Sequence, residues 1–387
     1  MEIRFGIIGY GVQGKLYASI LSGRAESGSL KIKKPAKCCL TAISSRSGSA
    51  GEDYKDNQEI TVFTDWKELI DSGRCDAVIL TVPHFQHTEM AIYAMERNLP
   101  VLCEKPAAIR ASDVEKMIAV SKQHPSAAFG LILNQRTNPV FRKIKEAVAS
   151  GELGEIRRSN WIINSWWRPD SYYRSSPWRG TWQGEGGGVL VNQAPHQLDL
   201  WGWICGVPET VFAICKEGCH RDITVENDVT ILTEYGNGAT GSFITCTHDP
   251  LGTNRLEIDC SRGKIVVEDN KKATIVRFAK EESEWNRTLD VKTFSGLLYQ
   301  NPEELFKKEE FSESLPMGQE YVLIFENFAA HIEHGEALIA PGADGLFSVQ
   351  LANAAQLASA KRQQLEFPCS TKEFNEYLKM RMEQENG

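Results

Sequence analysis

The sequence predicts a two-domain protein of the α/β and α+β classes, with a parallel sheet in the first domain and an α/β second domain with a large, open, mainly antiparallel sheet. Three observations predict this architecture. A glycine-rich turn from Gly9 to Gly14 directly follows a short apolar run. Up to about residue 133, apolar runs alternate with helical patterns, which is typical of βαβ units. Beyond it, strand patterns alternate with glycine-containing turns, which indicates antiparallel pairing.

Length and charge limit the possible functions. A chain of 387 residues is long enough for two domains, because single cores rarely grow beyond about 250 to 300 residues. A net charge of -8 gives no basic footprint for nucleic acid or an anionic membrane. No apolar run approaches the roughly 20 residues of a membrane span, and a strand pattern near Glu2 leaves no room for a signal peptide. We expect a cytoplasmic protein acting on a small molecule.

The first domain, residues 1–133, is expected to contain six parallel strands and four helices. The strand patterns are Ile3–Ile8, Cys38–Ser44, Thr61–Phe63, Ala77–Val82, Pro100–Cys103 and Ala128–Leu133. The helical patterns are Lys15–Ser22, Trp66–Asp71, His87–Arg97 and Ser112–Gln123, the last opening on a capping-box pattern from Ser112 to Glu115.

The second domain, residues 134–387, is expected to bind substrate and to carry the oligomer contact. A helix near Val140–Ser150 is followed by strand patterns at Glu155–Ile163, Thr210–Lys216, Asp228–Tyr235, Ala239–Thr247, Arg255–Cys260, Lys264–Glu268 and Ala273–Phe278. Two helical stretches, Gln319–Glu333 and Leu346–Lys361, are not assigned to either domain by their pattern. Since an antiparallel sheet can leave one face uncovered, we expect a homodimer or homotetramer formed through this sheet.

The glycine turn predicts a dinucleotide site of the Rossmann type. Gly9 permits the tight turn, Gly11 lets the backbone approach a pyrophosphate, and Gly14 allows close packing of helix on strand. The pyrophosphate would lie on a helix N-terminus that begins near Val12 and Gln13.

The end of the second strand favours NADP over NAD. The position where NAD-specific turns carry an acid reads Ser44-Ser45-Arg46-Ser47. Ser45 and Arg46 suit a 2′-phosphate, which an acid would repel. The alternative for Arg46 is a solvent-facing loop residue.

Two further segments carry functional residues. Glu104-Lys105-Pro106 places a lysine at the end of a parallel strand, and the run from Gly186 through Asn192, His196 and Asp199 follows later. These two segments resemble the Gfo/Idh/MocA family, the relatives of glucose-fructose oxidoreductase and inositol dehydrogenase. The same resemblance extends to the glycine turn, Thr81–His87, Ser150–Ile156 and Asp344-Gly345. The resemblance covers nearly the whole chain.

The resemblance implies hydride transfer between a nicotinamide and a hydroxyl of a sugar or cyclitol, with Lys105 near the reacting hydroxyl and His196 as general acid/base. An ammonium favours developing alkoxide charge, and an imidazole exchanges protons near neutral pH. Many members have aspartate where this chain has Asn192, which would hydrogen-bond a substrate hydroxyl. Asp199 would orient the imidazole, or be an ordinary helix carboxylate. Members of that family often hold the proline of this segment in the cis form, so the resemblance implies a cis Lys105-Pro106 bond.

The resemblance also implies further residues around the cofactor. They are Thr81, Pro83, His84, His87, Glu104, Asn134 and Arg136.

The segment from Trp161 to Trp182 is unusually rich in aromatic residues and arginine. Aromatic faces pack on the C–H faces of a sugar, and arginines bind hydroxyls or acids. Trp161 lies in a strand pattern and is expected in the core. The candidates for substrate contact are Trp167, Arg168, Tyr173 and Trp178, on a loop broken by prolines.

No metal site is expected, because the ten cysteines are scattered and Cys215-x-x-x-Cys219 lacks a partner pair. Two alternatives to a dehydrogenase remain open. Some relatives use a tightly bound nicotinamide to cleave a glycosidic bond by transient oxidation, and others resemble regulators of sugar metabolism that bind dinucleotide without catalysis.

Overall fold

The computed structural model describes residues 2–28 and 30–385. The chain divides into two compact units, each described separately below. The first contains the residues up to Thr137 together with Leu315–Val349, and the second contains Asn138–Ser314 and the residues from Gln350 onward.

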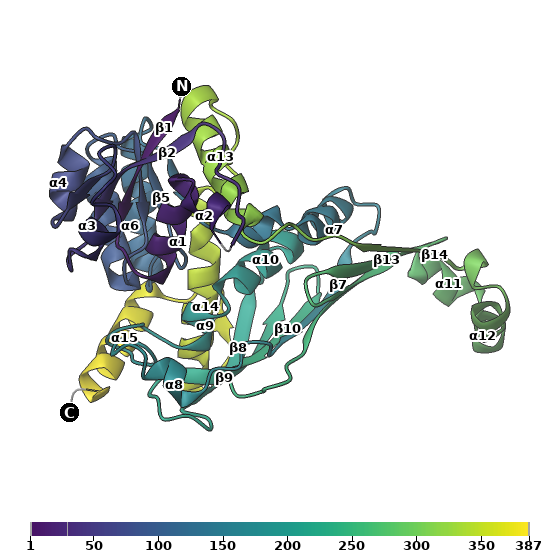
Figure 1. Cartoon of the computed structure of the whole chain (residues 1–387). Coiled ribbons are helices and arrows are strands. Elements are labelled where there is room, and N and C mark those ends of the chain that lie inside the picture. Colours follow the sequence, from purple (N-terminus) through teal and green to yellow (C-terminus); the bar gives the residue numbers. More distant parts are fainter. Residues whose placement is uncertain (1, 29, 386–387) are drawn as a thin grey trace. The chain divides into compact units, whose positions relative to one another are not determined.

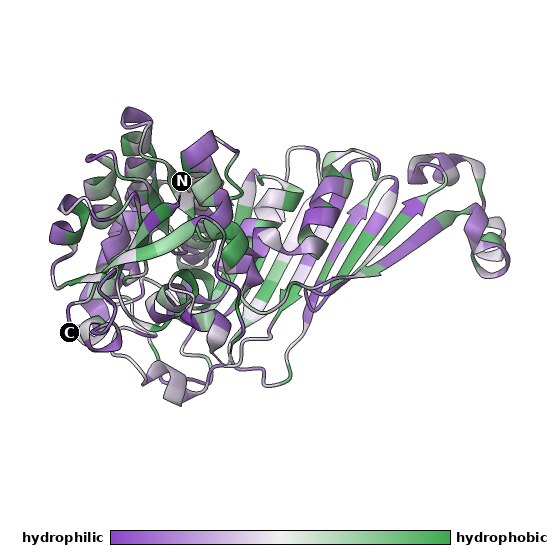
Figure 2. Ribbon diagram, turned by 45° about the horizontal axis from the view of Figure 1, so that its top comes forward, coloured by the Kyte–Doolittle hydropathy of each residue, from purple (hydrophilic) through white to green (hydrophobic). Residues whose placement is uncertain are grey.

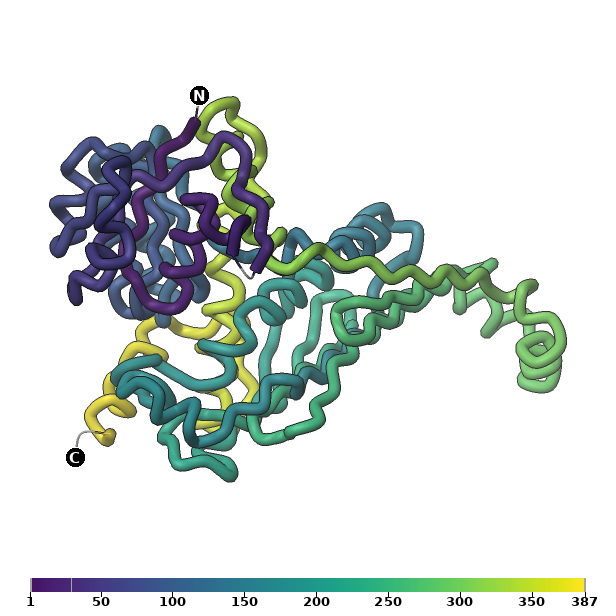
Figure 3. Tube along the Cα trace, in the orientation of Figure 1, coloured from purple at the N-terminus to yellow at the C-terminus, as the bar shows by residue number. Residues whose placement is uncertain are grey.

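The second unit is therefore not the continuous segment 134–387 that we expected. The chain returns to the first unit at Leu315–Val349 (Figure 3). This return assigns the helix at Gln319–His334 to the first unit, whereas the helix at Gly345–Lys361 runs from the first unit into the second.

The first unit contains a six-stranded parallel sheet in the order β3-β2-β1-β4-β5-β6, the order of a Rossmann fold. Its strands are β1 (Ile3–Ile8), β2 (Cys38–Ser44), β3 (Thr61–Phe63), β4 (Ala77–Leu80), β5 (Val101–Cys103) and β6 (Phe129–Leu131). Its helices are α1 (Val12–Leu21), α2 (Arg24–Ser27), α3 (Ser49–Asp53), α4 (Trp66–Asp71), α5 (His87–Met95), α6 (Ala111–Gln123) and α13 (Gln319–His334), with 3-10 turns η1 (His84–Gln86), η2 (Asn134–Thr137) and η4 (Gly342–Asp344).

Helix α13 completes the core on one face of this sheet, where it lies beside β1 and β2 (Figure 1). Phe325 and Phe328 are buried and each packs on Phe5 of β1, with ring centroids 6.4 Å apart. An apolar helix face from late in the sequence thus covers strands from its beginning.

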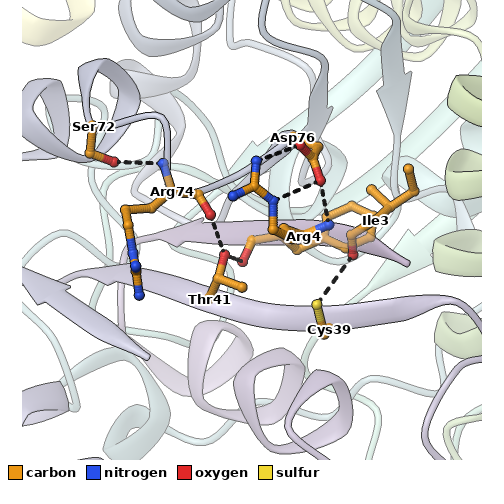
Figure 4. A network of polar contacts seen from close by, with 8 residues as sticks. Ile3, Arg4, Cys39, Thr41, Ser72, Arg74 and Asp76 are labelled. Carbon is orange, nitrogen blue, oxygen red and sulfur yellow. Dashed lines mark hydrogen bonds and ion pairs between the residues drawn. The ribbon is translucent and has the colours of Figure 1, made fainter. Parts of the chain in front are cut away.

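The N-terminal edge of the parallel sheet is joined by a polar network (Figure 4). The Arg4 guanidinium binds Asp76 through Nε at 3.1 Å and Nη2 at 2.8 Å, and the Arg4 backbone N–H donates to the same carboxylate at 2.9 Å. Thr41 donates its hydroxyl to the Arg74 carbonyl at 2.8 Å. These contacts connect β1 and β2 to the loop that enters β4.

The second unit contains a nine-stranded sheet in the order β14-β13-β12-β11-β7-β10-β9-β8-β15, in which only β7 and β10 pair in parallel. Its strands are β7 (Ile156–Ile163), β8 (Thr210–Glu217), β9 (Glu226–Glu234), β10 (Thr240–Cys246), β11 (Asn254–Cys260), β12 (Gly263–Glu268), β13 (Lys272–Phe278), β14 (Phe306–Ser312) and β15 (Leu365–Glu366). Its helices are α7 (Pro139–Ala149), α8 (Asp170–Tyr173), α9 (Val189–Asn192), α10 (Pro195–Cys205), α11 (Glu282–Thr288), α12 (Val291–Gln300), α15 (Thr371–Glu385) and most of α14 (Gly345–Lys361), with the 3-10 turn η3 (Pro302–Glu304).

One face of the larger sheet packs against helices. Trp161 of β7 is fully buried, as expected, and its ring lies 5.8 Å from that of Phe141 in α7 and 6.0 Å from Phe243. Trp201 of α10 lies 5.7 Å from Phe243. Hydrophobic and hydrophilic residues alternate along several strands (Figure 2). On the opposite face, Ile214 and Leu232 are 49% and 48% exposed.

Several elements differ from the sequence prediction. The pattern did not reveal α11, α12, α15, β14 or β15. Helix α6 begins at Ala111 and its N-cap is Arg110, without a side-chain cap, so the predicted capping box at Ser112 is wrong. No helix of the described residues is long and apolar enough to cross a membrane.

Candidate cofactor and substrate sites

The glycine turn between β1 and α1 has the geometry that dinucleotide binding requires. Gly9 has φ +100°, which side-chain-bearing residues rarely adopt. A Cβ on Gly14 would lie 2.2 Å from the Gly9 carbonyl oxygen and 2.9 Å from Thr81 Oγ1, whereas a Cβ on Gly11 would meet no atom within 4 Å. Gly14 thus allows close packing, and the space beside Gly11 suits a pyrophosphate.

Helix α1 presents its N-terminus next to this turn. Its N-cap is Gly11, which forms no side-chain cap hydrogen bond. Val12 is exposed, and Gln13 is partly buried and donates to the Tyr17 hydroxyl at 3.5 Å. The backbone N–H groups of the first helical turn can therefore bind an anion with the help of the helix dipole.

The end of β2 carries a cluster of serine hydroxyls. Ser45 Oγ lies 3.3 Å from Ser47 Oγ and 3.4 Å from Ser49 Oγ, and Arg46 is exposed between them. Because β2 pairs with β1, this turn adjoins the glycine turn, and the Gly9 N–H donates to the Ser44 carbonyl at 3.1 Å.

A carboxylate that the sequence prediction missed also lies near the turn. Asp53 at the end of α3 accepts a hydrogen bond from the Tyr10 hydroxyl at 2.9 Å and lies 3.7 Å from Lys15 Nζ. Burial, followed by the hydrogen bond to Asp53, raises the pKa of Tyr10. Only the fold reveals this contact, because Asp53 lies outside β2.

The ends of β4 and β5 carry further predicted residues. Thr81 donates its hydroxyl to the Gly9 carbonyl at 2.8 Å and so ties β4 to the glycine turn. Glu104 is buried and accepts hydrogen bonds from the Tyr17 hydroxyl and, at 2.9 Å, from the Lys105 backbone N–H. Burial raises the pKa of Glu104, while the charge of Lys105 opposes this shift.

Lys105 follows β5 and is partly buried, and the Lys105-Pro106 bond is cis, as expected. Pro83 and the buried residues His84 and Asn134 follow β4 and β6. Since the strands are parallel, these positions share the carboxyl edge of the sheet with the glycine turn.

Two of the predicted cofactor contacts, His87 and Arg136, also bind other segments of the first unit. His87 is fully buried, with Nδ1 3.0 Å from the Pro106 carbonyl and Nε2 2.9 Å from the Val82 carbonyl, and burial lowers its pKa. The buried guanidinium of Arg136 donates to Asp344 at 2.5 Å. Both side chains connect backbone segments, which sequence spacing alone does not reveal.

The second unit places Asn192 and His196 on consecutive helices. Asn192 is the last residue of α9, whereas His196 lies in the first turn of α10, which begins at Pro195. Both side chains are partly buried. Asp199 is buried one turn after His196, which excludes the alternative of a surface carboxylate.

Glu185 is a polar group of this region that the sequence analysis missed. It is buried, accepts a hydrogen bond from the Asn192 side-chain amide, and accepts another from the Gly180 backbone at 2.8 Å. A carboxylate thus fixes the amide of Asn192. The signal available in the sequence was an acid directly before the glycine run at 186–188.

Tyr172 is at the centre of the aromatic and basic segment, although the sequence analysis did not select it as a contact. Its hydroxyl accepts hydrogen bonds from Arg179 and, at 3.3 Å, from Asn192 Nδ2. The guanidinium carbons of Arg168 and Arg179 lie 4.9 and 4.4 Å from its ring centroid. Arg179 also lies 4.5 Å from the ring of Trp178. Tyr172 therefore connects the stacked arginine and aromatic groups to Asn192.

The remaining aromatic side chains separate into exposed and buried ones. Trp167 is 48% exposed. Tyr173 is buried with its hydroxyl 2.9 Å from Thr247 Oγ1, and its contact with substrate stays a prediction. Trp182 is also buried and donates to the Thr224 carbonyl at 2.9 Å.

The glycine run before α9 is fixed by Glu226 at the start of β9. Its Oε1 accepts hydrogen bonds from the backbone N–H groups of Gly188 at 2.9 Å and Leu190 at 3.3 Å, and Gln356 donates to Oε2 at 3.2 Å. A Cβ on Gly188 would lie 1.9 Å from the Glu226 carbonyl oxygen. Burial raises the pKa of Glu226 to about 7.

Together, the predicted residues form two groups. The first unit brings the glycine turn, Ser45, Arg46, Thr81, Glu104 and Lys105 to one sheet edge. The second unit carries Asn192, His196 and Asp199 beside the aromatic and arginine side chains. The first group suits a dinucleotide, and the second offers an imidazole and hydrogen-bonding groups for a polar ligand.

Known protein families match segments in both units of the chain. Residues 3–129 match an oxidoreductase family with an NAD-binding Rossmann fold, and residues 141–266 match the GFO/IDH/MocA C-terminal domain. Myo-inositol 2-dehydrogenase of Thermotoga maritima is 24% identical over 365 residues, which cover 92% of this chain and 95% of that protein. Levoglucosan dehydrogenase of Pseudarthrobacter phenanthrenivorans is 24% identical over 249 residues, covering 57% and 63% of the two chains.

Solved structures share the fold. The WlbA dehydrogenase from Bordetella pertussis, in complex with NADH and UDP-GlcNAcA, has a TM-score of 0.74 at 21% identity and covers 96% of this chain and 100% of its own. Levoglucosan dehydrogenase in complex with NADH and levoglucosan has a TM-score of 0.76 at 19% identity, and the match covers 95% of this chain and 99% of that protein. With both of its units matched, the chain belongs to the Gfo/Idh/MocA family of NAD-binding oxidoreductases.

Proposed function

We propose that this protein is an NAD(P)-dependent dehydrogenase that oxidises a secondary hydroxyl of a sugar, a sugar derivative or a cyclitol. The observation that carries the proposal is the carboxyl edge of the first sheet, where the glycine turn adjoins two strands that are followed by Thr81 and by Glu104-Lys105. The names of similar proteins, an inositol and a levoglucosan dehydrogenase, support the substrate class.

The nicotinamide, when bound, accepts or returns the hydride. Lys105 would stabilise negative charge that develops on the substrate oxygen, and His196 would take up the hydroxyl proton. Asn192 would hydrogen-bond a neighbouring hydroxyl, with its amide fixed by Glu185. Asp199, one helical turn after His196, would orient the imidazole.

Substrate selection is assigned to the segment around Tyr172. The exposed Trp167 offers an aromatic face for a sugar ring. Arg168 and Trp178 complete the proposed substrate contacts, and Arg179 holds the Tyr172 hydroxyl.

For the cofactor, we favour NADP over NAD because Ser45, Ser47 and the exposed Arg46 lie where a ribose 2′-phosphate would bind. The two similar structures named above contain NADH, so both nucleotides must be compared. Arg46→Ala should raise the Kd for NADP about tenfold and leave the Kd for NAD unchanged. An unchanged Kd for NADP would exclude Arg46 from the site.

The experiment that tests the function is a panel of sugars and cyclitols with NAD and NADP, followed at the nicotinamide absorbance band. Lys105→Ala and His196→Ala should each lower kcat about 10²- to 10⁴-fold. The Kd for the nucleotide should change by a smaller factor. Lys122→Ala and His124→Ala, at the end of α6 and just after it, are matched controls that should retain full activity.

The products distinguish the remaining alternatives. Ketone released in equal amount to reduced cofactor supports the dehydrogenase, and glycoside cleavage without net reduction would indicate the transient-oxidation hydrolase. The double variant at Lys105 and His196 tests the regulator. If it binds nucleotide and has the same activity as the wild type, the pair is not catalytic, and a regulator is favoured.

We also propose a homodimer or homotetramer that associates through the second sheet. The exposed Ile214 and Leu232 lie on the face of that sheet opposite the Trp161 core. Apolar surface of this kind is typical of subunit contacts.

A further inference from the structure

We propose that Cys219, Asp228 and His248 bind a divalent transition-metal ion, with Zn²⁺ as the expected metal. Cys219 Sγ, a carboxylate oxygen of Asp228 and a ring nitrogen of His248 all lie within 4.8 Å of one another. These residues come from the loop after β8, from β9 and from the segment after β10. The proposed hydride transfer uses none of them.

The three donors match the chemistry of zinc. Thiolate, imidazole and carboxylate bind Zn²⁺ at about 2.0 to 2.3 Å in tetrahedral geometry, which places neighbouring ligand atoms about 3.3 to 3.6 Å apart. His248 Nε2 and Asp228 Oδ2 are already 2.8 Å apart. Closing the group around a metal therefore needs movements of about 1 Å, which rotation of the partly exposed side chains provides.

A buried asparagine holds the backbone that carries these ligands. Asn227 accepts a hydrogen bond from the Cys219 backbone N–H at 2.7 Å and donates to the Cys219 carbonyl at 2.8 Å. The Asn227 side-chain amide also donates to Thr247 Oγ1 at 3.3 Å. The Asn227 backbone carbonyl accepts a hydrogen bond from the Thr247 N–H at 2.9 Å. Asn227 is thus connected to all three ligand residues: it is hydrogen-bonded to Cys219, it precedes Asp228 in the sequence, and it is hydrogen-bonded to Thr247, which precedes His248.

Three protein ligands leave one tetrahedral position for water or for a further side chain. We assign that position to water. The His220 ring lies edge-on to the His248 ring with centroids 5.2 Å apart, but His220 is outside the ligand group.

A metal at this position would stabilise the loop after β8, which contacts the aromatic segment. Arg221 in this loop donates from Nε to the Arg168 carbonyl at 2.5 Å, and the Thr224 N–H donates to the Gly180 carbonyl at 3.2 Å. We therefore assign the metal a structural role. Sequence spacing did not reveal the site because its ligands come from three separate segments.

The test uses the untagged full-length chain, freed of metal by a chelator and titrated with Zn²⁺ and with Co²⁺ as a spectroscopic probe. We expect one equivalent of either metal and a thiolate-to-cobalt charge-transfer band. At a hundredfold excess of Zn²⁺ over its Kd, the Tm should rise by about 5 to 10 °C.

Cys219→Ser should abolish the charge-transfer band, and His248→Ala and Asp228→Asn should each weaken Zn²⁺ binding at least tenfold. Cys246→Ser is the matched control, because Cys246 pairs with Asp228 in the sheet but is outside the ligand group. It should bind metal like the wild type. Circular dichroism of the metal-free variants checks that they fold.

Three results would overturn the proposal: no saturable binding, binding that survives Cys219→Ser, or loss of the band in Cys246→Ser alone. Because binding and spectra are measured without substrate or nicotinamide, failure here is distinguishable from failure of the proposed dehydrogenase activity.

Discussion

At the scale of single residues, Gly11 and Gly14 lie in one turn but serve different purposes. The position of Gly14 has no room for a side chain, since a Cβ would meet the Gly9 carbonyl oxygen at 2.2 Å. The position of Gly11 has room, and its φ of -81° suits any residue. Gly14 is therefore required for packing, whereas Gly11 leaves open space for the proposed dinucleotide.

Gly14→Ala should destabilise the first unit by about 1 to 3 kcal/mol, because the backbone must shift to relieve the clash. It should also weaken dinucleotide binding. Denaturant unfolding and nucleotide titration measure the two effects.

Gly11→Ala is the matched substitution. It should unfold at the wild-type denaturant concentration and yet bind dinucleotide at least tenfold more weakly, since the new methyl group occupies space needed by the pyrophosphate. Equal nucleotide affinity in this variant would contradict the assignment of the phosphate position.

Glu226 is a second residue whose role depends on its surroundings. Burial raises its pKa to about 7, so between pH 4.5 and 7 the folded protein holds a proton that the unfolded chain has released. Stability from this group is present below pH 4.5, falls as pH rises towards 7, and is constant above it.

Glu226→Gln should remove this pH dependence. Between pH 4.5 and 8 the wild type should lose about 3 kcal/mol that the variant keeps. The measurement is the difference in unfolding free energy between the two proteins across that range. A parallel pH dependence of both would show that Glu226 ionises normally.

At the scale of elements, an ion pair between Arg4 and Asp76 joins the start of β1 to the residue before β4 (Figure 4). The guanidinium hydrogen bond holds the pKa of Asp76 below its ordinary value of 3.8. The stability from this pair is therefore fully present above the unfolded pKa and is lost as the pH falls through the lower, folded pKa.

Asp76→Asn should lower the unfolding free energy by about 1 kcal/mol at pH 7, a modest value because both side chains are partly exposed. The difference from the wild type should shrink below pH 3. Thermal unfolding at pH 7 and pH 2.5 measures this change, and an equal difference at both would contradict the ion-pair explanation.

Elements with strong hydrophobic periodicity were predictable from the sequence. β1, β2 and β3 and helix α4 have the predicted bounds, because their apolar patterns match what the sheet buries. By contrast, β14 has the sequence FKKEEFS and is largely hydrophilic (Figure 2). It is a strand because it pairs with β13, and a polar edge strand has no periodic signal of its own.

At the scale of the whole molecule, the open face of the second sheet is the proposed contact between subunits. Leu232→Glu places a charge on this face, next to Phe212 of β8. We expect the oligomer to dissociate at least 100-fold more readily, because burying an unpaired charge is costly. Sedimentation velocity over a range of concentrations measures the dissociation.

Leu251→Glu is the control. Leu251 is 95% exposed and lies outside the strands, so this variant should assemble like the wild type. A monomeric wild-type protein at high concentration, or full assembly of Leu232→Glu, would exclude the sheet face as the contact.

The sequence by itself determined the fold class, the family and the glycine turn with Lys105, since these depend on local patterns and on residues close together in the chain. Only the tertiary structure decided that Leu315–Val349 belongs to the first unit, that His87 and Arg136 are buried and bind the Pro106 carbonyl and Asp344, and that Glu185 holds Asn192. The physical reason is that burial and hydrogen-bond partners are set by segments far apart in the sequence, and residue spacing along the chain contains no record of those meetings.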